Sequence, residues 1–128
     1  MGAGWYNGFG GKVKKGENVE EAAKREVYEE CGVKVKNQIK VGVVNFKFTN
    51  DLSKIWEVHI FLSKNFTGKP LETKEMKPKW FLVSKIPFDK MWPVDKYWLP
   101  LAIAEQKFTG KIVYNDKNEI VSFAFSLN

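Results

Sequence analysis

The sequence predicts an α+β fold, a mixed β-sheet with helices on its faces, and three of its features lead to this prediction. The chain has 128 residues, the length of one domain, and we expect residues 1–128 to form a single domain. Its composition, 44% hydrophobic and 15% aromatic, supplies a core and excludes a disordered chain. Helical and β-rich segments alternate without strand–helix–strand regularity, which favours a mixed sheet over a doubly wound parallel one.

The first helix is predicted over residues 18–31. Asn18 is a favourable N-cap, Glu21 follows three residues later, and Gly32 lies just past the end, where glycine commonly stops a helix. The apolar residues repeat at helical spacing and predict a buried stripe made of Val19, Ala22, Ala23 and Val27.

The segments after this helix are rich in β-branched and aromatic residues and predict strands. Two long strands are expected, with a turn between them, and three shorter strands and a second helix follow. Pro100 is expected to distort the early turns of that helix. The predicted ranges are 41–48 and 55–62 for the long strands, 50–54 for their turn, 80–83, 111–114 and 120–125 for the short strands, 115–118 for the last turn, and about 95–107 for the helix.

Charge and cysteine content limit the classes of partner. The net charge of +6 comes from twenty Lys and one Arg against 15 acidic residues, and it favours either anionic partners or simple solubility. The lysines are scattered rather than clustered, so we expect no stable nucleic-acid partner. No apolar run is long enough to cross a bilayer, and no membrane partner is expected. Cys31 is the single cysteine, which excludes a disulfide scaffold and favours the cytoplasm.

Three carboxylates on the first predicted helix suggest a metal site. Glu26, Glu29 and Glu30 lie at positions i, i+3 and i+4, so their side chains project from one face and repel one another. A hard divalent cation such as Mg²⁺ would neutralise them and keep waters for a phosphate-bearing substrate. The alternative is an acidic helix face that only meets solvent.

The spacing around these carboxylates resembles the signature of the Nudix hydrolases at every defined position, which are Gly11, Glu17, Arg25, Glu26, Val27, Glu29, Glu30, Gly32 and Val33. The resemblance implies the Nudix fold, an α/β/α sandwich around a mixed sheet, and an enzyme that cleaves phosphorus anhydrides. It implies Mg²⁺, with Mn²⁺ as a substitute, on the three glutamates and the backbone carbonyl of Gly10 or Gly11. Arg25 would orient the carboxylates, and Glu17 would help to fix the loop.

Further motifs resemble the group of Nudix hydrolases that acts on oxidised purine nucleoside triphosphates. These motifs are residues 7–12, Phe46 with Phe48, residues 75–78, residues 91–93 and Asp95 with residues 97–98. The group releases pyrophosphate from damaged nucleotides and so sanitises the nucleotide pool. By this resemblance, Glu75 is a further metal ligand or base from outside the helix.

The same motifs contain side chains suited to bind a nucleotide. Trp92 can stack on a purine, while Asn7 and Asp95 can hydrogen-bond to its edge. Lys12 can reach a phosphate. The full set of expected substrate contacts is Asn7, Phe9, Gly10, Gly11, Lys12, Phe46, Phe48, Trp56, Met76, Trp92 and Asp95. For any one aromatic side chain, the alternative is ordinary core packing.

Two features depart from the resemblance. The family has two adjacent acids after Trp-Pro, whereas Val94 precedes Asp95 here, and we expect an altered preference among oxidised bases. The family also has an N-terminal strand and hairpin before the glycine segment, and we expect this chain to lack them. A more open base pocket should result, with homodimerisation, strand swapping or a rearranged sheet as compensation.

The sequence leaves three other functions open. One is a catalytically impaired Nudix domain that only binds nucleotides. Another is a Nudix hydrolase of other nucleotides, such as unmodified dNTPs or ADP-ribose. A third is an RNA-binding or RNA-decapping relative, which the net positive charge and the aromatic residues would suit.

Overall fold

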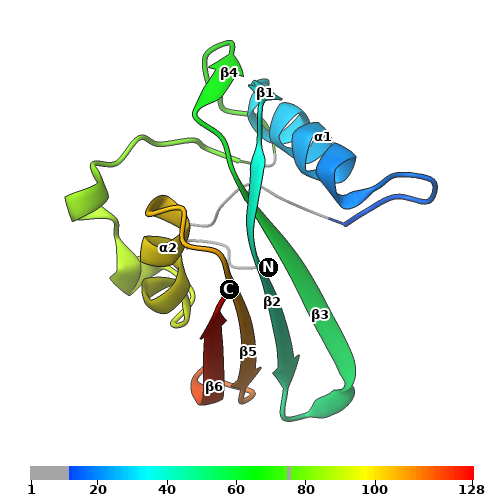
Figure 1. Ribbon diagram of the computed structural model, residues 1–128, viewed down its shortest axis with the longest axis vertical. Helices are drawn as coiled ribbons and strands as arrows, with labels where there is room; N and C mark the ends of the chain where they lie inside the picture. The colour runs from blue at the N-terminus through cyan, green and yellow to red at the C-terminus, as the bar shows by residue number, and fades with distance from the viewer. Residues whose placement is uncertain (1–11, 75) are drawn as a thin grey trace. The chain divides into compact units, whose positions relative to one another are not determined.

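The computed structural model describes residues 12–74 and 76–128, and Figure 1 shows the order of its elements. The helices are α1 (Val19–Cys31) and α2 (Asp95–Ile103), with short 3₁₀ turns at Val83–Lys85 and Phe88–Lys90. The strands are β1 (Lys34–Lys36), β2 (Ile39–Phe48), β3 (Asp51–Leu62), β4 (Asn65–Thr67), β5 (Phe108–Tyr114) and β6 (Ile120–Leu127). In the described part of the chain, neither helix has the length and apolar character of a membrane-spanning segment.

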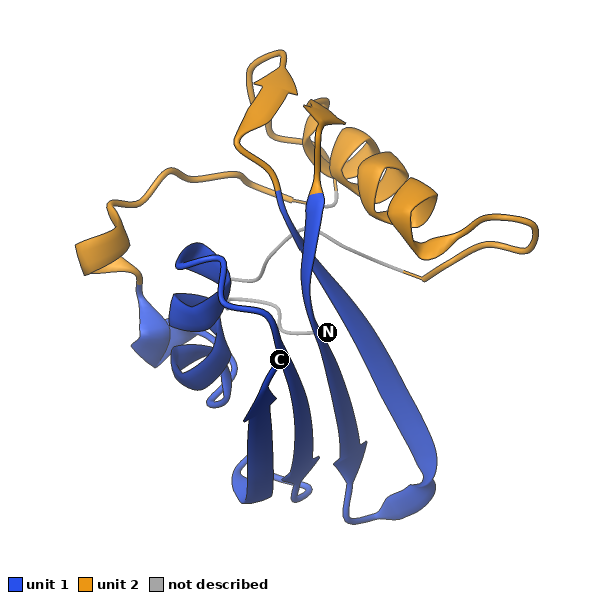
Figure 2. Ribbon diagram, viewed as in Figure 1, with its two compact units in different colours: residues 1–6, 39–62, 87–128 blue, residues 7–38, 63–86 orange. Residues whose placement is uncertain are grey.

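The described residues divide into two compact units, which Figure 2 colours separately. Residues 39–62 and 87–128 form one, here called the sheet unit. Residues 12–38 and 63–86, without residue 75, form the other, here called the α1 unit.

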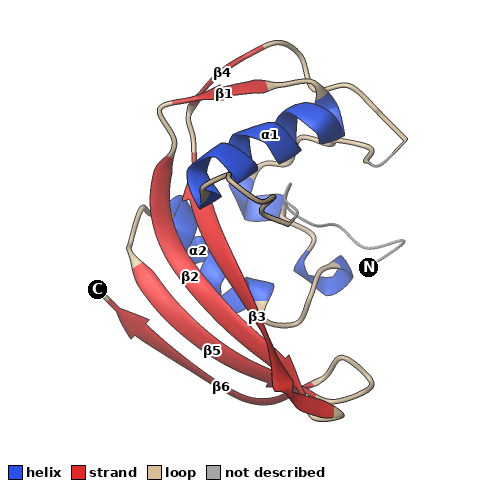
Figure 3. Ribbon diagram, turned by 90° about the vertical axis from the view of Figure 1, so that its right-hand side faces the viewer, coloured by secondary structure: helices blue, strands red, loops and turns tan. Residues whose placement is uncertain are grey.

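The sheet unit is built on a four-stranded mixed sheet with the order β3-β2-β5-β6 (Figure 3). The pairs β2–β3 and β5–β6 are antiparallel, whereas β2 and β5 run parallel, with Gly42 opposite Phe108 and Phe48 opposite Tyr114. The parallel pair in the centre makes the sheet mixed, as the sequence predicts. The predicted α+β class is confirmed.

The core of the sheet unit lies where α2 packs on one face of this sheet. Alternate residues of β5 are buried because successive side chains of a strand point to opposite faces. Its buried members are Val41, Val44, Val94, Ala102, Phe108, Ile112 and Tyr114. Gly42 and Gly110 allow two aromatic rings to approach the sheet, since a Cβ at either position would lie 2.5 Å from a ring atom of Phe108 or Phe125.

The α1 unit confirms the predicted ends of its helix. The Asn18 side chain accepts a hydrogen bond from the Glu21 backbone, and Gly32 is left-handed (φ 77°), where glycine carries no Cβ penalty. A two-stranded antiparallel ladder of β1 and β4 follows, with Val35 opposite Phe66. The chain then returns to the end of α1, where the Leu71 backbone donates to the Cys31 carbonyl at 2.9 Å.

Several predicted boundaries are wrong. The turn expected over 50–54 is only the two residues 49–50, because Phe48 already pairs with Asp51 and β3 starts there. Residues 80–83, all of which are described, contain no strand, and a 3₁₀ turn begins at Val83. The second helix ends at Ile103 instead of near residue 107, since Glu105 adopts a left-handed conformation (φ 58°). The strands β1 and β4 are too short to stand out in the sequence.

Candidate functional site

Arg25 joins the loop before α1 to the carboxylates of the helix. Its Nε and Nη2 donate to the two carboxylate oxygens of Glu17 at 2.8 and 3.1 Å, a bidentate pair. Its Nη1 donates to Glu26 at 2.6 Å and to Glu29 at 3.0 Å, and Nη2 also donates to the Lys12 carbonyl at 3.0 Å. One guanidinium therefore holds three carboxylates and a loop carbonyl. We call Arg25, Glu17, Glu26, Glu29 and Lys12 the arginine cluster.

The local sequence explains this arrangement. Glu29 lies one helical turn after Arg25, the spacing at which helix side chains meet. Glu17 is fixed from the loop side, because its Oε1 also accepts from the Lys14 backbone at 3.1 Å. The hydrogen bond from Arg25, and to a lesser degree that from Lys14, holds the pKa of the Glu17 carboxyl below its ordinary value. The same pairing with Glu17 and Glu26 raises the pKa of Arg25.

Glu30 has a different environment from Glu29, although the two are adjacent. Glu30 is buried (4% exposed), whereas the Glu29 side chain is 41% exposed. The returning segment lies against the end of the helix, where the Thr73 hydroxyl donates to the Glu30 carbonyl at 2.7 Å. The three helix glutamates therefore combine one buried carboxylate with two that Arg25 contacts.

The donor chemistry of these glutamates fits a hard divalent cation, since carboxylate oxygens are the ligands such ions prefer. Within residues 12–74 and 76–128, no three His, Cys, Asp or Glu side chains are gathered closely enough to hold a metal ion. The carboxylates of Glu26 and Glu29 are directed to Arg25 instead. A cation would share these two carboxylates with the guanidinium.

The sheet unit contains a second group of side chains, here called the aromatic cluster, made of the predicted residues Phe46, Phe48, Trp56 and Trp92 together with Tyr114. Phe46 stacks on Trp56 with ring centres 6.0 Å apart and meets Phe48 edge-on at 6.0 Å. Trp92 meets Phe48 at 6.4 Å and Tyr114 at 5.2 Å. Such offset and edge-on contacts are favourable for aromatic pairs. Strands β2, β3 and β5 and the segment before α2 each supply a member.

Asp95 is a buried acid beside this cluster, at the first residue of α2. It is 7% exposed, and the Trp98 indole donates to its Oδ1 at 2.9 Å. Burial raises the pKa of Asp95 to about 6, against the opposing effect of hydrogen bonds from Trp98 and from the Trp92 backbone. Burial and the charge of Asp95 together raise the pKa of Tyr114. Asp95 can therefore change its protonation state close to neutral pH.

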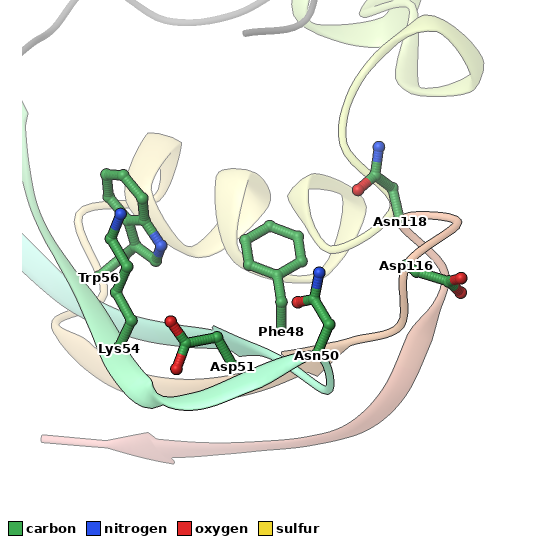
Figure 4. A pocket seen from close by; sticks show the side chains of 7 residues that line it. All are labelled: Phe48, Asn50, Asp51, Lys54, Trp56, Asp116 and Asn118. Atoms are coloured by element: carbon green, nitrogen blue, oxygen red, sulfur yellow. The ribbon is translucent and has the colours of Figure 1, made fainter.

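A hollow of about 330 Å³ opens beside the aromatic cluster, between the β2–β3 turn and the β5–β6 turn. Figure 4 shows Phe48 between Trp56 on one side and Asn118 on the other, with Lys54 lying along the indole. The Lys54 ammonium is 4.4 Å from the centre of the Trp56 ring, a cation–π contact. The residues that line the hollow are Phe48, Asn50, Asp51, Lys54, Trp56, Asp116 and Asn118. The volume is at the small end of the range for small-molecule sites.

The predicted site residues fall in both units. The α1 unit holds Lys12, Arg25, Glu26, Glu29, Glu30 and Met76, and the sheet unit holds Phe46, Phe48, Trp56, Trp92 and Asp95. Met76 is half-buried, and its carbonyl accepts from the Thr73 backbone at 2.9 Å. The predictions for Asn7, Phe9, Gly10, Gly11 and Glu75 lie outside the described residues.

Two residues of the sheet unit were not predicted as site residues: Tyr114 in the aromatic cluster and Lys54 at the hollow beside it. Tyr114 is the last residue of β5 and contacts Phe46, Phe48 and Trp92, and Lys54 covers the Trp56 ring. The signal for Tyr114 is the alternation of β5, in which Phe108, Gly110, Ile112 and Tyr114 share the buried face. The alternation shows that Tyr114 is buried, but its place beside Phe46 and Phe48 follows only once β5 is known to pair with β2. Lys54 lies in the segment predicted as a turn, so its side-chain direction could not be inferred.

Comparison with known proteins gives consistent matches. A family model described as NUDIX domain matches residues 1–102. The chain is 44% identical to the oxidized purine nucleoside triphosphate hydrolase of Mus musculus, over 97% of this chain and 79% of that protein. It is 43% identical to the protein of the same name in Danio rerio, over 94% and 77%. The crystal structure of a mutator MutT protein from Bacillus halodurans superimposes with a TM-score of 0.89 and 25% identity, over 96% of this chain and 83% of that chain.

The chain therefore belongs to the Nudix family. The resemblance seen in residues 11–33 is confirmed, and so is the Nudix fold. Within this family it is a hydrolase of phosphorus anhydrides, as the named hydrolases among its relatives indicate. Nudix hydrolases generally use a divalent metal ion, the group for which the glutamates of α1 have suitable oxygen donors.

Proposed function

We propose that this chain hydrolyses oxidised purine nucleoside triphosphates to the monophosphate and pyrophosphate, and so removes damaged nucleotides from the nucleotide pool. The observation that carries the proposal is its 43–44% identity to two relatives named for this activity. The match spans 97% of the chain for the mouse protein, so it includes the arginine cluster and the aromatic cluster alike. An intact set of helix glutamates supports an enzyme over a domain that only binds nucleotides.

The residues of α1 are proposed to act on the phosphates. Glu26, Glu29 and Glu30, with Glu75 and the Gly10 carbonyl, would hold Mg²⁺, with Mn²⁺ as a substitute. When bound, such an ion lowers the pKa of water and offsets negative charge on the leaving pyrophosphate. Arg25 fixes the directions of Glu26 and Glu29 through its hydrogen bonds. The Lys12 ammonium would bind a phosphate oxygen. One of the helix carboxylates or Glu75 would serve as the general base.

The residues of the sheet unit are proposed to bind the base. Trp92 offers a ring face for stacking, with Phe46, Phe48 and Trp56 as apolar walls. Asp95 would hydrogen-bond to the base edge, and its pKa of about 6 lets it accept or donate near neutral pH. Met76, Asn7, Phe9, Gly10 and Gly11 are proposed as further contacts of the substrate.

The domain organisation, partners, compartment and oligomeric state of the enzyme are also part of the proposal. We infer one Nudix domain over residues 1–128, a nucleotide as the partner, and no stable nucleic-acid partner. Cys31 is a free, buried cysteine at the end of α1, which supports the cytoplasm as the compartment. A homodimer is part of the proposal, and light scattering of the purified chain tests it: a monodisperse monomer would contradict it.

Pyrophosphate release in the presence of Mg²⁺ tests the proposed activity. The substrates are 8-oxo-dGTP, 2-hydroxy-dATP, O6-methyl-dGTP, dGTP, dATP and ADP-ribose, with Glu30→Gln as the inactive variant. Glu20→Gln is the matched control, because Glu20 is an exposed glutamate in the first turn of the same helix.

We expect hydrolysis that prefers an oxidised purine, persists in Glu20→Gln and is lost in Glu30→Gln. Hydrolysis of plain dNTPs or ADP-ribose alone would keep the Nudix chemistry and reject the proposed substrate. No turnover of any nucleotide, with binding retained, would favour the impaired nucleotide-binding domain.

A further inference from the structure

Strand β6 (Ile120–Leu127) forms one edge of the four-stranded sheet, as Figure 3 shows. Within the described ranges it pairs with β5 on one side, and no strand lies on its other side. The backbone N–H and C=O groups of a strand alternate between its two sides, so about half of those in β6 point away from β5. These groups can hydrogen-bond to another extended strand.

The two edge strands of this sheet differ in charge. The other edge strand, β3, carries Asp51, Lys54 and Glu57, whereas β6 has no charged residue in a chain that is 28% charged. Charged side chains and prolines are common means of keeping an edge strand from pairing with another molecule, and β6 has neither. Its pairing with β5 is also regular from Ser122 to Leu127. The edge of β6 is therefore suited to pair with a further strand.

Exposed apolar side chains accompany this edge. Phe123 is 48% exposed and Leu127 is 63% exposed. Both lie on the face of the sheet against which α2 packs, since Phe123 stacks on Tyr97 of α2 and Leu127 lies opposite the core residue Phe108. A strand added at this edge would remove part of this apolar surface from water, which favours the pairing.

We propose that β6 pairs in antiparallel fashion with β6 of a second copy of this chain, so that the two sheets join into one. The proposal rests on the homodimer of the proposed function and assigns its interface. In such a dimer the main-chain hydrogen bonds across the new strand pair provide the affinity, and the side chains that meet across it provide the specificity.

The sequence of β6 makes a second copy a suitable partner. A two-fold axis through Ala124 would place Phe123 opposite the partner's Phe125 and Ser122 opposite the partner's Ser126. Because successive side chains alternate between the faces, aromatic pairs would meet on one face of the joined sheet and small residues on the other. Two copies with a net charge of +6 repel each other, and a strand without charged side chains adds no further repulsion at the contact.

Sedimentation velocity and hydrogen exchange of the wild-type chain, each over a series of protein concentrations, test the interface. We expect dimers to form as the concentration rises, and the amides of β6 that point away from β5 to become protected from exchange in the dimer. A dimer that leaves these amides unprotected would overturn the proposal. A chain that stays monomeric would also overturn it, and would leave the edge to a strand of another protein.

The variant Ala124→Glu is designed to weaken this interface without harm to the fold. Ala124 is exposed and lies opposite Lys111 of β5, so a glutamate there gains a neighbour of opposite charge within its own chain. Across the proposed axis, it would meet the same glutamate of the second copy. Thr109→Glu is the matched control, because Thr109 is exposed on the same face of the sheet but belongs to the inner strand β5. Circular dichroism and thermal unfolding establish that each variant is folded.

At low salt, we expect the dissociation constant of the dimer to rise about two- to fivefold in Ala124→Glu, the range for like charges directly opposite each other on two strands. High salt should bring it back towards the wild-type value, because salt screens the repulsion between exposed charges. Thr109→Glu should dimerise as wild type does. A folded Ala124→Glu with an unchanged dissociation constant would overturn the proposal.

Hydrolysis measured on the same samples separates this inference from the proposed activity. A monomeric wild type that hydrolyses oxidised purine nucleoside triphosphates would overturn the β6 interface and the homodimer, and would leave the proposed activity intact. A dimer with protected β6 amides that hydrolyses none of the tested nucleotides would support the interface and reject the activity.

Discussion

The arginine cluster and the aromatic cluster are assembled in opposite ways. The residues of the arginine cluster lie between positions 12 and 29, and one loop and one helix bring them together. The aromatic cluster joins residues from positions 46 to 114, brought together by a parallel strand pair and the segment before α2. The arginine cluster could be located from the spacing of residues along the sequence, whereas locating the aromatic cluster required knowledge of the strand pairing in the sheet.

The two clusters also differ in the interactions that hold their side chains in place. The arginine cluster is partly exposed, and ion pairs near solvent contribute little to stability, so its value lies in the directions it gives to carboxylates. The aromatic cluster packs against buried residues of the core, where ring contacts contribute to both stability and shape. Substitutions in the two regions should therefore separate catalytic effects from effects on stability.

The largest effect is expected for Arg25→Ala. This change releases Glu17, Glu26 and Glu29 at once, and loss of a group that orients metal ligands typically lowers metal affinity or activity about 10–100-fold. Activity measured against Mg²⁺ concentration should fall by this factor and require more metal. Lys24→Ala, an exposed neighbour on the same helix, should behave as wild type. If Arg25→Ala kept full activity, the arginine cluster would have no part in the chemistry.

A stability effect without a catalytic one is expected in the sheet unit. A Cβ at Gly42 would meet three ring atoms of Phe108 at 2.5–2.8 Å, and Phe108 is 1% exposed. Gly42→Ala should lower the free energy of unfolding by about 1–3 kcal/mol, the usual range for overpacking. Gly110→Ala meets the half-buried ring of Phe125 and should be milder. Urea unfolding would contradict this reasoning if Gly110→Ala were the more damaging change.

The third expected effect is a change of stability with pH that depends on Asp95. Burial raises the pKa of Asp95 from 3.8 to about 6, so the folded protein binds a proton more tightly than the unfolded chain. The contribution of Asp95 to stability is therefore present below about pH 4 and is lost as the pH rises to about 6. Thermal unfolding across this window should show Asp95→Asn becoming relatively more stable as the pH rises. A constant difference between the two proteins would argue against a raised pKa.

The sequence predicted most strongly those features that depend on neighbours in the chain. Asn18 and Gly32 marked the ends of α1, and the spacing from Gly11 to Val33 pointed to the Nudix family. The extent of β3 was missed because Asn50 to Lys54 has the composition of a turn, although pairing with β2 extends the strand to Asp51. Tyr114 was missed for a related reason, since its neighbours come from β2 and the segment before α2. Such partners are set by tertiary packing, which no local pattern records.

The parallel pairing of β2 with β5 affects how the chain folds while it is being synthesised. The register joins Gly42 to Phe108, so the central strand pair cannot close until the ribosome has delivered residues far downstream. Pairings between distant residues slow folding, because the loop between them must first be ordered. The capped helix α1 depends on local contacts and can form early. In the nascent chain, α1 would therefore form before β2 can pair with β5. Until then, the edge of β2 that later pairs with β5 is open to incorrect pairing with other strands.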